Sequence, residues 1–332
     1  PMLFIDDEAD NASVNTRKPE LDPTRTNALI RQILTLFRKS CYVGYTATPF
    51  ANIFINPEAY DDETRDDLFP RDFIYCLDAP TSYFGADRIF LSPEAEAQHL
   101  RTIRDAEDII PLKHKIDLDL QELPASLKRA IRQFVLARAI RNLRGQSGKH
   151  CSMLINVSRF VAVQKNIRVL VKQYVELLKQ AIQTNYRLPP ERMSGNTHMA
   201  ALRSEFLEEF GAAGETWDEV LAELHTAVES IKLFVVNSSK SDELLDYAAY
   251  EREGKALTAI AIGGLSLSRG LTIEGLTISY MYRNTRMYDT LMQMGRWFGY
   301  RKGYEDLCRV WLSEESINWY AHIAQTTEEL RE

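Results

Sequence analysis

Carboxylic acids cluster directly behind a short apolar run at the start of the sequence. Leu3–Ile5 leads into Asp6, Asp7 and Glu8, and Asp10 follows two positions later. An apolar run that ends in Asp and Glu is typical of a strand that serves nucleotide hydrolysis, because one carboxylate can hold Mg²⁺ through water while its neighbour orients the attacking water. We predict a Mg²⁺ site at Asp7 and Glu8, in which Asp7 holds the metal and Glu8 is the base. Asp6, one position earlier, could take the role of either residue. A solvated acidic loop or a helix cap is the alternative.

Short hydroxyl side chains occur in a second apolar run. We predict a strand over residues 40–55, and Thr46 and Thr48 lie within it. At the end of a neighbouring strand, their hydroxyls can hydrogen-bond to the acidic loop and so contribute to the nucleotide site. Threonine is also ordinary in strands, so this feature alone is weak.

Four short sequence segments, in this order, resemble motifs II, III, V and VI of superfamily-two helicases and translocases. They are DEAD (7–10), TAT (46–48), SRGLTI (268–273) and QMGRWFGYR (293–301). Together with SMLINVSRF (152–160), they are similar to the bacterial endonuclease Z-one domain, a helicase-related family that occurs in restriction–modification and phage-defence gene clusters with DNA methyltransferases and MutL-like ATPases. The resemblance spans nearly the whole chain. It implies two RecA-like lobes of the P-loop NTPase type, ATP and Mg²⁺ as cofactors, and DNA, with duplex favoured, as a partner.

The resemblance also implies roles for residues of the second half. Arg269 and Gly270 correspond to the motif V loop, which faces both nucleotide and nucleic acid. Arg296 and Arg301 are the candidates for an arginine finger on the ATP phosphates, with Gln293 as a phosphate-sensing neighbour. The family usually spaces its two arginines by three positions, whereas these are five apart, so either could be the finger.

Basic residues offer two candidate contacts with nucleic acid. The better candidates flank the motif V and VI strands, where arginines can contact the phosphate backbone: they are Arg269, Arg283 and Arg286. The basic helix predicted over 124–145 could also follow a backbone, but its arginines fall on several faces, and a solvated helix is the alternative. The aromatic group at Trp297, Phe298 and Tyr300 is expected to pack in the core or between domains rather than to stack on bases.

The sequence lacks one motif that an ATP-hydrolysing protein of this kind requires. A phosphate-binding loop of the form G-x-x-x-x-G-K-[ST] should precede the acidic strand, and the nearest string, RGQSGKH at 144–150, has the wrong spacing and no Ser or Thr after its lysine. Because Pro1 stands directly before the first apolar run, we expect a truncated first lobe whose phosphate-binding loop lies upstream in a longer protein. The present chain alone should then hydrolyse ATP hardly at all.

Two rival functions stay open. Asp246, Glu253 and Lys255 could form the D…E-x-K arrangement that holds Mg²⁺ in nucleases, although a charged turn accounts for Glu253 and Lys255 equally well. The other rival is a DNA-binding or scaffold subunit that does not use ATP.

The amino-acid composition and the hydrophobic pattern predict the fold that positions these residues. The 332 residues carry a net charge of −7 and are 45% hydrophobic, which predicts a globular protein without blanket attraction to nucleic acid. Scattered cysteines and the lack of a membrane-spanning run favour the cytoplasm. We expect two α/β domains, residues 1–123 and 124–332, the second with a helical insertion near 185–230. Predicted strands are 3–5, 40–55, a run near 72–77, 151–157, 231–237, 257–264, 276–282 and 308–312, and predicted helices are 30–39, 124–145, 160–184, 199–231 and 287–298.

Overall fold

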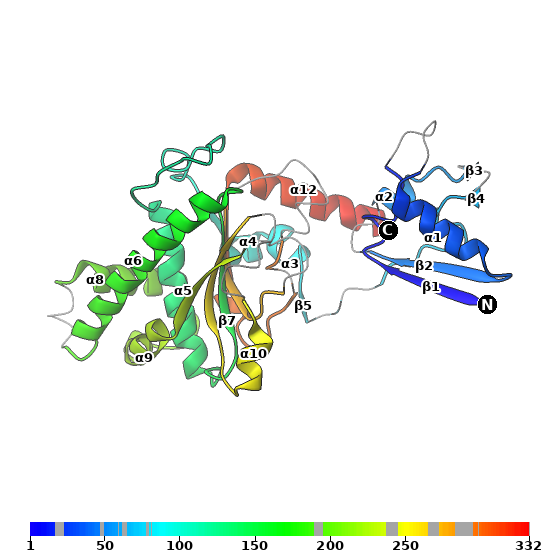
Figure 1. Cartoon of the computed structure of the whole chain (residues 1–332). Coiled ribbons are helices and arrows are strands. Elements are labelled where there is room, and N and C mark those ends of the chain that lie inside the picture. The colour runs from blue at the N-terminus through cyan, green and yellow to red at the C-terminus, as the bar shows by residue number, and fades with distance from the viewer. Residues whose placement is uncertain are drawn as a thin grey trace. The chain divides into compact units, whose positions relative to one another are not determined.

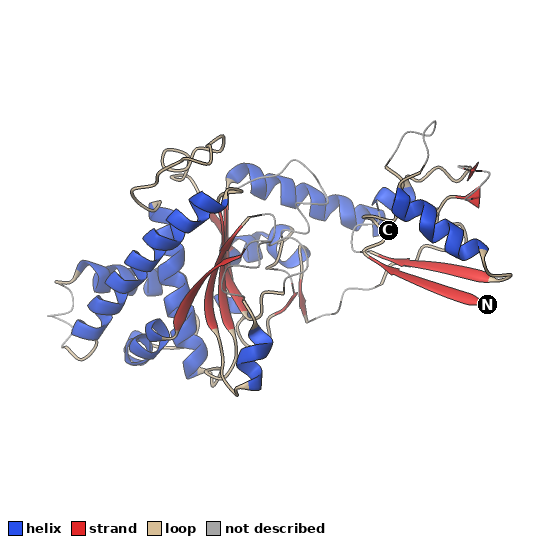
Figure 2. Cartoon of the chain, viewed as in Figure 1, coloured by secondary structure: helices blue, strands red, loops and turns tan. Residues whose placement is uncertain are grey.

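The computed structural model divides the chain into two compact units, Pro1–Asp78 and Ala79–Glu332. Figure 1 labels their elements, and Figure 2 separates helices from strands. The structure describes residues 1–16, 23–46, 50–58, 60–61, 65–77, 80, 82–188, 195–236, 245–264, 272–282, 295–297 and 299–331. Within these ranges, no helix is both long enough and apolar enough to cross a bilayer.

Unit 1 is built on a pair of parallel strands with one helix between them in sequence. β1 (Met2–Asp7) pairs with β2 (Ser40–Tyr45) along its whole length. α1 (Arg25–Thr35) connects them and buries Ile30. This strand–helix–strand order confirms the parallel α/β pattern predicted here, because parallel neighbours need a crossover connection.

Of the strands predicted in unit 1, one is shorter than predicted and one is absent. The run 40–55 is a strand only to Tyr45, and Phe50–Ile53 forms the short helix α2. The proline at position 49 has no N–H for a strand ladder, so an apolar run through it could not stay paired. Residues 72–77 form no strand, and their apolar side chains are exposed. The only other strands described in this unit are β3 (Tyr60–Asp61) and β4 (Arg65–Asp66), an antiparallel pair.

A six-stranded sheet organises unit 2, and all its neighbouring strands run parallel in the order β6-β12-β10-β7-β9-β8. The strands are β6 (Leu100–Thr102), β7 (Cys151–Asn156), β8 (Ile231–Val236), β9 (Thr258–Gly263), β10 (Leu276–Met281) and β12 (Arg309–Leu312). Every residue of β7, β9, β10 and β12 is buried, which is why these strands read as nearly unbroken apolar runs. The mixed α/β class is confirmed, and the sheet is compatible with a Rossmann-like fold.

Helices cover both faces of this sheet (Figure 1). On one face, α5 packs against α8, α9 and β10, and α6 packs against α9, β8 and β9; α12 packs against α3. The helices are α3 (Asp87–Phe90), α4 (Pro93–His99), α5 (Ala125–Leu143), α6 (Val161–Asn185), α8 (Thr197–Glu209), α9 (Trp217–Glu229), α10 (Tyr247–Arg252) and α12 (Glu314–Arg331). The helices predicted at 124–145 and 160–184 are confirmed. The helix predicted at 287–298 lies outside the described residues except for 295–297.

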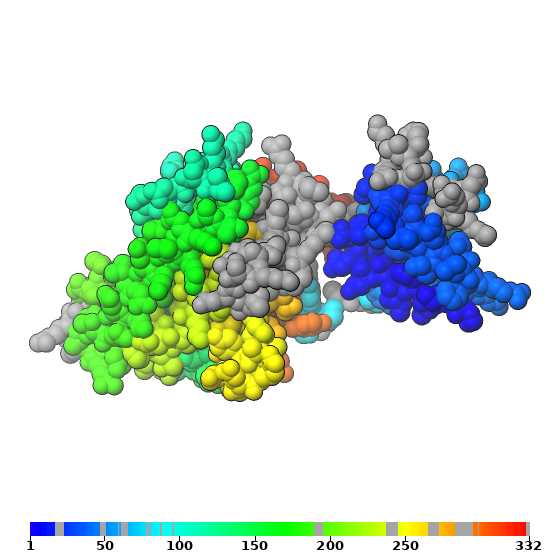
Figure 3. Space-filling view, in the orientation of Figure 1, coloured from blue at the N-terminus to red at the C-terminus, as the bar shows by residue number. Residues whose placement is uncertain are grey.

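The division between the units falls well before the boundary expected near residue 124. β6 pairs with β12 and forms the edge of the large sheet, and Ile89, Ile103 and Ile110 belong to the same core as β7. Asn166 of α6 donates a 3.1 Å hydrogen bond to Asp119, and Figure 3 shows this preceding segment lying against α6. Residues 82–123 therefore fold with unit 2, which a three-residue edge strand does not reveal in sequence.

Candidate functional site

The acidic turn consists of Asp6, Asp7 and Glu8 at the end of β1. Asp6 is half-buried, and the Tyr42 hydroxyl on β2 donates a 2.6 Å hydrogen bond to its Oδ2. Burial and the neighbouring Asp6 carboxylate raise the pKa of Tyr42, so the phenol keeps its proton and remains a donor. Asp7 and Glu8 are exposed. Asp6 is therefore tied to the second strand, whereas Asp7 and Glu8 are the acids that face solvent.

Glu8 adopts a backbone conformation that is uncommon for its residue type. Its φ is 59°, in the left-handed region, and among the described residues it is the only non-glycine with a positive φ. A residue with a Cβ in this region costs about 1–2 kcal/mol. Such outliers cluster at functional sites, where the surrounding structure holds them in place. The turn therefore keeps a conformation that costs stability at a residue that is exposed to solvent.

The segment after β2 holds the turn in place. The Ala9 N–H donates to the Tyr45 carbonyl at 3.0 Å, and the Asn52 side chain donates to the Ala9 carbonyl at 2.9 Å. A Cβ built on Gly44 would lie 2.8 Å from the Ala9 Cβ, so β2 needs glycine at this point. Asn52, which lies four residues beyond the TAT segment, is not among the site residues predicted from the sequence. Thr46 is partly exposed at the end of β2, and Thr48 lies outside the described residues.

The acidic turn fits a magnesium ion by the chemistry of its donors. Asp7 and Glu8 supply hard carboxylate oxygens at an exposed position, and the Asp7 Oδ1 accepts one hydrogen bond, from the Glu8 N–H at 3.1 Å. Mg²⁺ is usually held by one or two carboxylates and keeps several waters or phosphate oxygens. Two adjacent exposed carboxylates are enough for such a site.

The two arginine-finger candidates differ in their surroundings. Arg301 is buried, and its guanidinium donates to the carbonyls of Arg296, Trp297 and Tyr300 at 3.1–3.2 Å. Arg296 is partly exposed. A guanidinium that already holds three backbone carbonyls shapes its own loop. Gln293 lies outside the described residues.

The carboxyl edge of the large sheet is the second candidate surface. The chain passes from β7 to β8 and β9 on one side and then to β10 on the other, so the strand order reverses between β7 and β10, where α/β sheets bind ligands. Arg159 follows β7 there. It is exposed and contacts the Phe160 ring at 4.6 Å, with no acidic partner among the described residues. A Cβ on Gly264, after β9, would lie 3.1 Å from the Ser158 carbonyl. Arg269, Gly270, Arg283 and Arg286 lie outside the described residues.

Two buried amide oxygens at this edge lack a donor. Asn156 Oδ1 at the end of β7 and Gln164 Oε1 on α6 accept no hydrogen bond within the described part of the chain. Both residues are almost fully buried. Because buried polar groups are normally satisfied, these oxygens indicate that a polar group or water completes this edge.

A serine–histidine pair also lies at this edge. His114 Nδ1 is 2.6 Å from the Pro111 carbonyl and Nε2 is 2.8 Å from Ser158 Oγ, so Nδ1 carries the proton and the serine donates to Nε2. This is the geometry of an activated nucleophile. Ser158 is, however, fully buried, and its Oγ also accepts from the Phe160 N–H at 3.1 Å. The pair fastens the loop before α5 to the start of α6.

The basic residues of α5 pair with acids and backbone carbonyls of unit 2. Arg129 lies 2.7 Å from Glu208 and 3.1 Å from Glu205 of α8. Arg138 is buried and donates to the carbonyls of Ser147 and Lys149. The interpretation as a solvated helix is therefore wrong, because acids from α8 pair with its partly exposed arginines and backbone carbonyls bind its buried ones. Contact with nucleic acid at this helix stays a prediction.

The nuclease candidates have structural roles in the fold. Asp246 caps α10 by accepting from the Ala249 N–H at 3.0 Å. Lys255 lies 2.9 Å from Glu253 across an exposed turn; this pairing lowers the pKa of Glu253 and raises that of Lys255. The geometry favours the charged-turn interpretation of this segment.

A different trio brings metal-ligating atoms together. His150, Glu251 and Glu274 place their donor atoms within 4.8 Å of one another. His150 Nδ1 accepts a 2.9 Å hydrogen bond from the Leu257 N–H, so a neutral ring carries its proton on Nε2, the nitrogen that faces Glu251 at 3.5 Å. Metal-bound histidines instead donate from their second nitrogen. A neutral His150 with this hydrogen bond presents an N–H rather than a lone pair toward Glu251, which does not suit a metal ligand.

Comparison with known proteins gives one match. The family model described as the Z1 domain matches residues 126–332, which covers α5, five strands of the large sheet and α12. No curated protein and no solved structure matches the chain. The match covers more than half of the 332 residues, and the chain therefore belongs to the Z1 domain family.

Proposed function

We propose that this chain is part of an ATP-hydrolysing, DNA-acting motor of the helicase-related type, in which each unit forms part of a RecA-like lobe. The observation that carries the proposal is the acidic turn: Asp7 and Glu8 face solvent at the end of a parallel strand, and Glu8 is held in a left-handed conformation. Catalytic carboxylates of nucleotide-hydrolysing proteins require such a position.

The chemistry follows from the side chains. Bound Mg²⁺ would neutralise charge on the nucleotide phosphates. Asp7 would hold the ion through its waters, while the Glu8 carboxylate would accept a hydrogen bond from the attacking water and orient it. Arg296 would add positive charge at the phosphates, and Arg301 would keep the loop of Arg296 in shape through its three carbonyl bonds.

The DNA contact is proposed at the carboxyl edge of the large sheet. Arg159 supplies an exposed cation there, and in the sequence Arg269 follows β9 while Arg283 and Arg286 follow β10. Arginines that contact phosphates position a nucleic acid without reading its sequence. Membership of the Z1 family and the motif resemblance support a role in restriction–modification or phage defence, beside methyltransferase and MutL-like subunits.

The test is DNA-stimulated ATP hydrolysis by the intact protein. Glu8→Gln keeps the size of the side chain but removes its charge, and we expect kcat to fall by about 100-fold or more. Glu58→Gln is the matched control, because Glu58 is an exposed acid of the same unit that follows α2 rather than β1 in the sequence. Equal rates for wild type and Glu8→Gln would reject the mechanism. DNA cleavage with Mg²⁺ that is lost in Glu253→Ala would favour the nuclease instead.

A further inference from the structure

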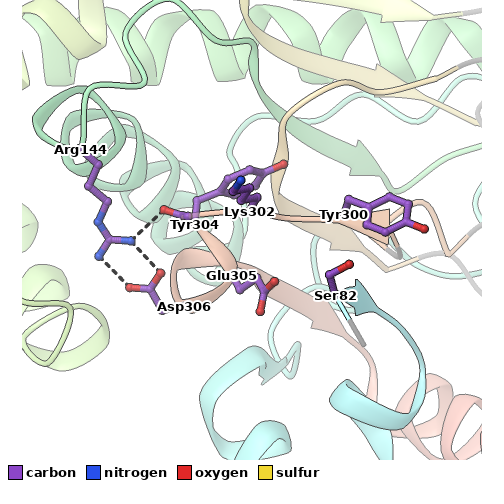
Figure 4. Close-up of a pocket in the computed structure, with 8 residues that line it drawn as sticks. Ser82, Arg144, Tyr300, Lys302, Tyr304, Glu305 and Asp306 are labelled. Carbon is purple, nitrogen blue, oxygen red and sulfur yellow. Dashed lines mark hydrogen bonds and ion pairs between the residues drawn. The ribbon is translucent and has the colours of Figure 1, made fainter. Parts of the chain in front are cut away.

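Unit 2 contains a pocket of about 750 Å³ that the groups discussed above do not use. We call it the Tyr300 pocket. Figure 4 shows Arg144 and Asp306 at one end of it and Tyr300 and Ser82 at the other, with Lys302 between them. Its volume lies within the range of about 300–1,000 Å³ that is usual for small-molecule sites.

One end of the pocket is fixed by internal contacts. Arg144 donates to both carboxylate oxygens of Asp306 at 2.7 and 2.8 Å and to Glu215 at 2.7 Å. Tyr304 is buried beneath the guanidinium of Arg141, whose Cζ is 4.0 Å from the ring centroid. These groups are already paired with one another, so they form a rigid wall of the pocket and are not expected to bind a ligand.

The other end presents side chains that have no such partners. β11 (Gly299–Tyr300) pairs with β5 (Tyr83–Phe84), and alternation along the chain turns Arg301 inward and leaves Tyr300 and Lys302 exposed. Tyr300 is 60% exposed and is held edge-to-face by Tyr83 at 5.6 Å. Within the described part of the chain, neither the Lys302 ammonium nor the Ser82 hydroxyl has an ion pair or hydrogen bond.

The charges around the pocket balance, but Arg144 pairs with both Glu215 and Asp306, so Lys302 has no direct ion-pair partner among the described residues. Asp306 lies 2.7 Å from Arg144, and Glu305 lies 3.3 Å from Arg88. An exposed aromatic ring beside an ammonium without an ion-pair partner is the combination that binds a base and its phosphate in proteins that hold nucleic-acid strands.

We propose that the Tyr300 pocket binds one nucleotide unit, with the base on the Tyr300 ring and the phosphate at Lys302 and Ser82. The site lies apart from the acidic turn in sequence and needs no hydrolysis, so it does not depend on the proposed ATPase. The nucleotide could be free or could belong to a single strand. Both sources share this chemistry, and a binding experiment separates them.

The experiment measures fluorescence anisotropy of a labelled oligo-dT of about 12 nucleotides with the full chain, without Mg²⁺. Tyr300→Leu removes the stacking ring, and we expect the affinity to fall at least about fivefold. Lys302→Ala should weaken binding and reduce the slope of log K against log salt by about 0.7, whereas Lys302→Arg should restore both. Lys172→Ala is the matched control, since Lys172 is an exposed lysine of α6.

Competition identifies the source. If dTMP competes as well per molecule as the oligonucleotide does, and thymidine competes much less well, the site binds a free nucleotide. If the oligonucleotide binds far more tightly than dTMP, the site binds one unit of a strand. The proposal is overturned if wild type binds neither probe, or if Tyr300→Leu and Lys302→Ala bind as Lys172→Ala does. Thermal unfolding of Lys302→Ala and Lys172→Ala should be unchanged, because both side chains are exposed, and Tyr300→Leu should lose only the edge-to-face contact with Tyr83.

Discussion

Replacing Glu209 with glutamine should strongly destabilise unit 2. Glu209 ends α8 and is almost fully buried; Arg101 of β6 donates to it at 2.7 Å and Arg309 of β12 at 2.8 Å. Arg309 is also almost fully buried and contacts the Phe210 ring at 4.7 Å. Glu209→Gln keeps the shape of the side chain but leaves the buried guanidinium of Arg309 without its counter-charge.

The size of the effect follows from burial. Breaking a buried ion pair by removing one partner costs about 3–5 kcal/mol, because the other charge stays desolvated and unmatched. Glu208, the preceding residue, pairs with Arg129 at 2.7 Å but is 58% exposed, and an exposed pair contributes about 0–1 kcal/mol. The free energy of unfolding should therefore fall by about 3–5 kcal/mol in Glu209→Gln and by at most about 1 kcal/mol in Glu208→Gln.

Urea unfolding followed by tryptophan fluorescence measures this difference in the right unit. The sequence has four tryptophans, and all lie after residue 78, so the signal reports unit 2. The midpoint should shift strongly to lower urea in Glu209→Gln with an unchanged slope. A shift equal to that of Glu208→Gln would show that Glu209 and Arg309 do not form a desolvated pair, and would refute the reasoning.

The same pair makes a pH prediction. Although burial raises the pKa of Glu209, hydrogen bonds from Arg101 and Arg309 outweigh it and lower the pKa below the usual value. A depressed carboxyl pKa contributes stability that is present above the unfolded pKa of about 4.3 and lost as the pH falls through the folded pKa. The stability gap between wild type and Glu209→Gln should thus be full at neutral pH and shrink below about pH 4.

Three further outcomes are expected. Glu8→Gly should leave unit 1 as stable as wild type or slightly more stable, because glycine relieves the left-handed φ. The same variant should abolish ATP hydrolysis by the intact protein. A large loss of stability, measured by hydrogen exchange, would contradict a functional origin of this conformation. Arg301→Ala should lower both the melting temperature and the rate of hydrolysis, since the carbonyls of Arg296, Trp297 and Tyr300 lose their donor; an unchanged melting temperature would contradict this structural role. Zinc added to the full chain should not raise the melting temperature through His150, and a rise that is lost in His150→Gln would show that this nitrogen binds metal after all.

Much of the fold could be predicted from sequence where burial is continuous. β7, β9, β10 and β12 are buried along their whole length, so their apolar runs are unambiguous. β1 was equally clear, because its apolar residues end abruptly in acids. By contrast, the residues at 72–77 are apolar enough for a strand yet form none, since apolar composition does not supply a strand neighbour to pair with.

The side-chain environment of α5 could not be predicted. Its helix and its start at Pro124 follow from local rules, but arginine is ordinarily a surface residue, and the acids that neutralise Arg129 come more than 70 positions later. Only the fold brings α8 against α5. For the same reason the acidic turn could be predicted as a group, whereas the parts of β2 and α2 that hold it, Gly44 and Asn52, could not.

Glu8 and the arginines of α5 both break a local rule, and the difference between them bears on function. Burying Arg138 is costly, but the fold compensates with the carbonyls of Ser147 and Lys149. The left-handed φ of Glu8 is also costly, yet its carboxylate meets no hydrogen-bond donor among the described residues. Backbone hydrogen bonds from Ala9 to Tyr45 and from Asn11 to Glu8 hold the turn but do not engage this carboxylate, and natural sequences break local rules mainly at functional sites. A strained and exposed carboxylate at the end of a parallel strand is therefore better explained by a ligand that it orients than by the stability of the turn.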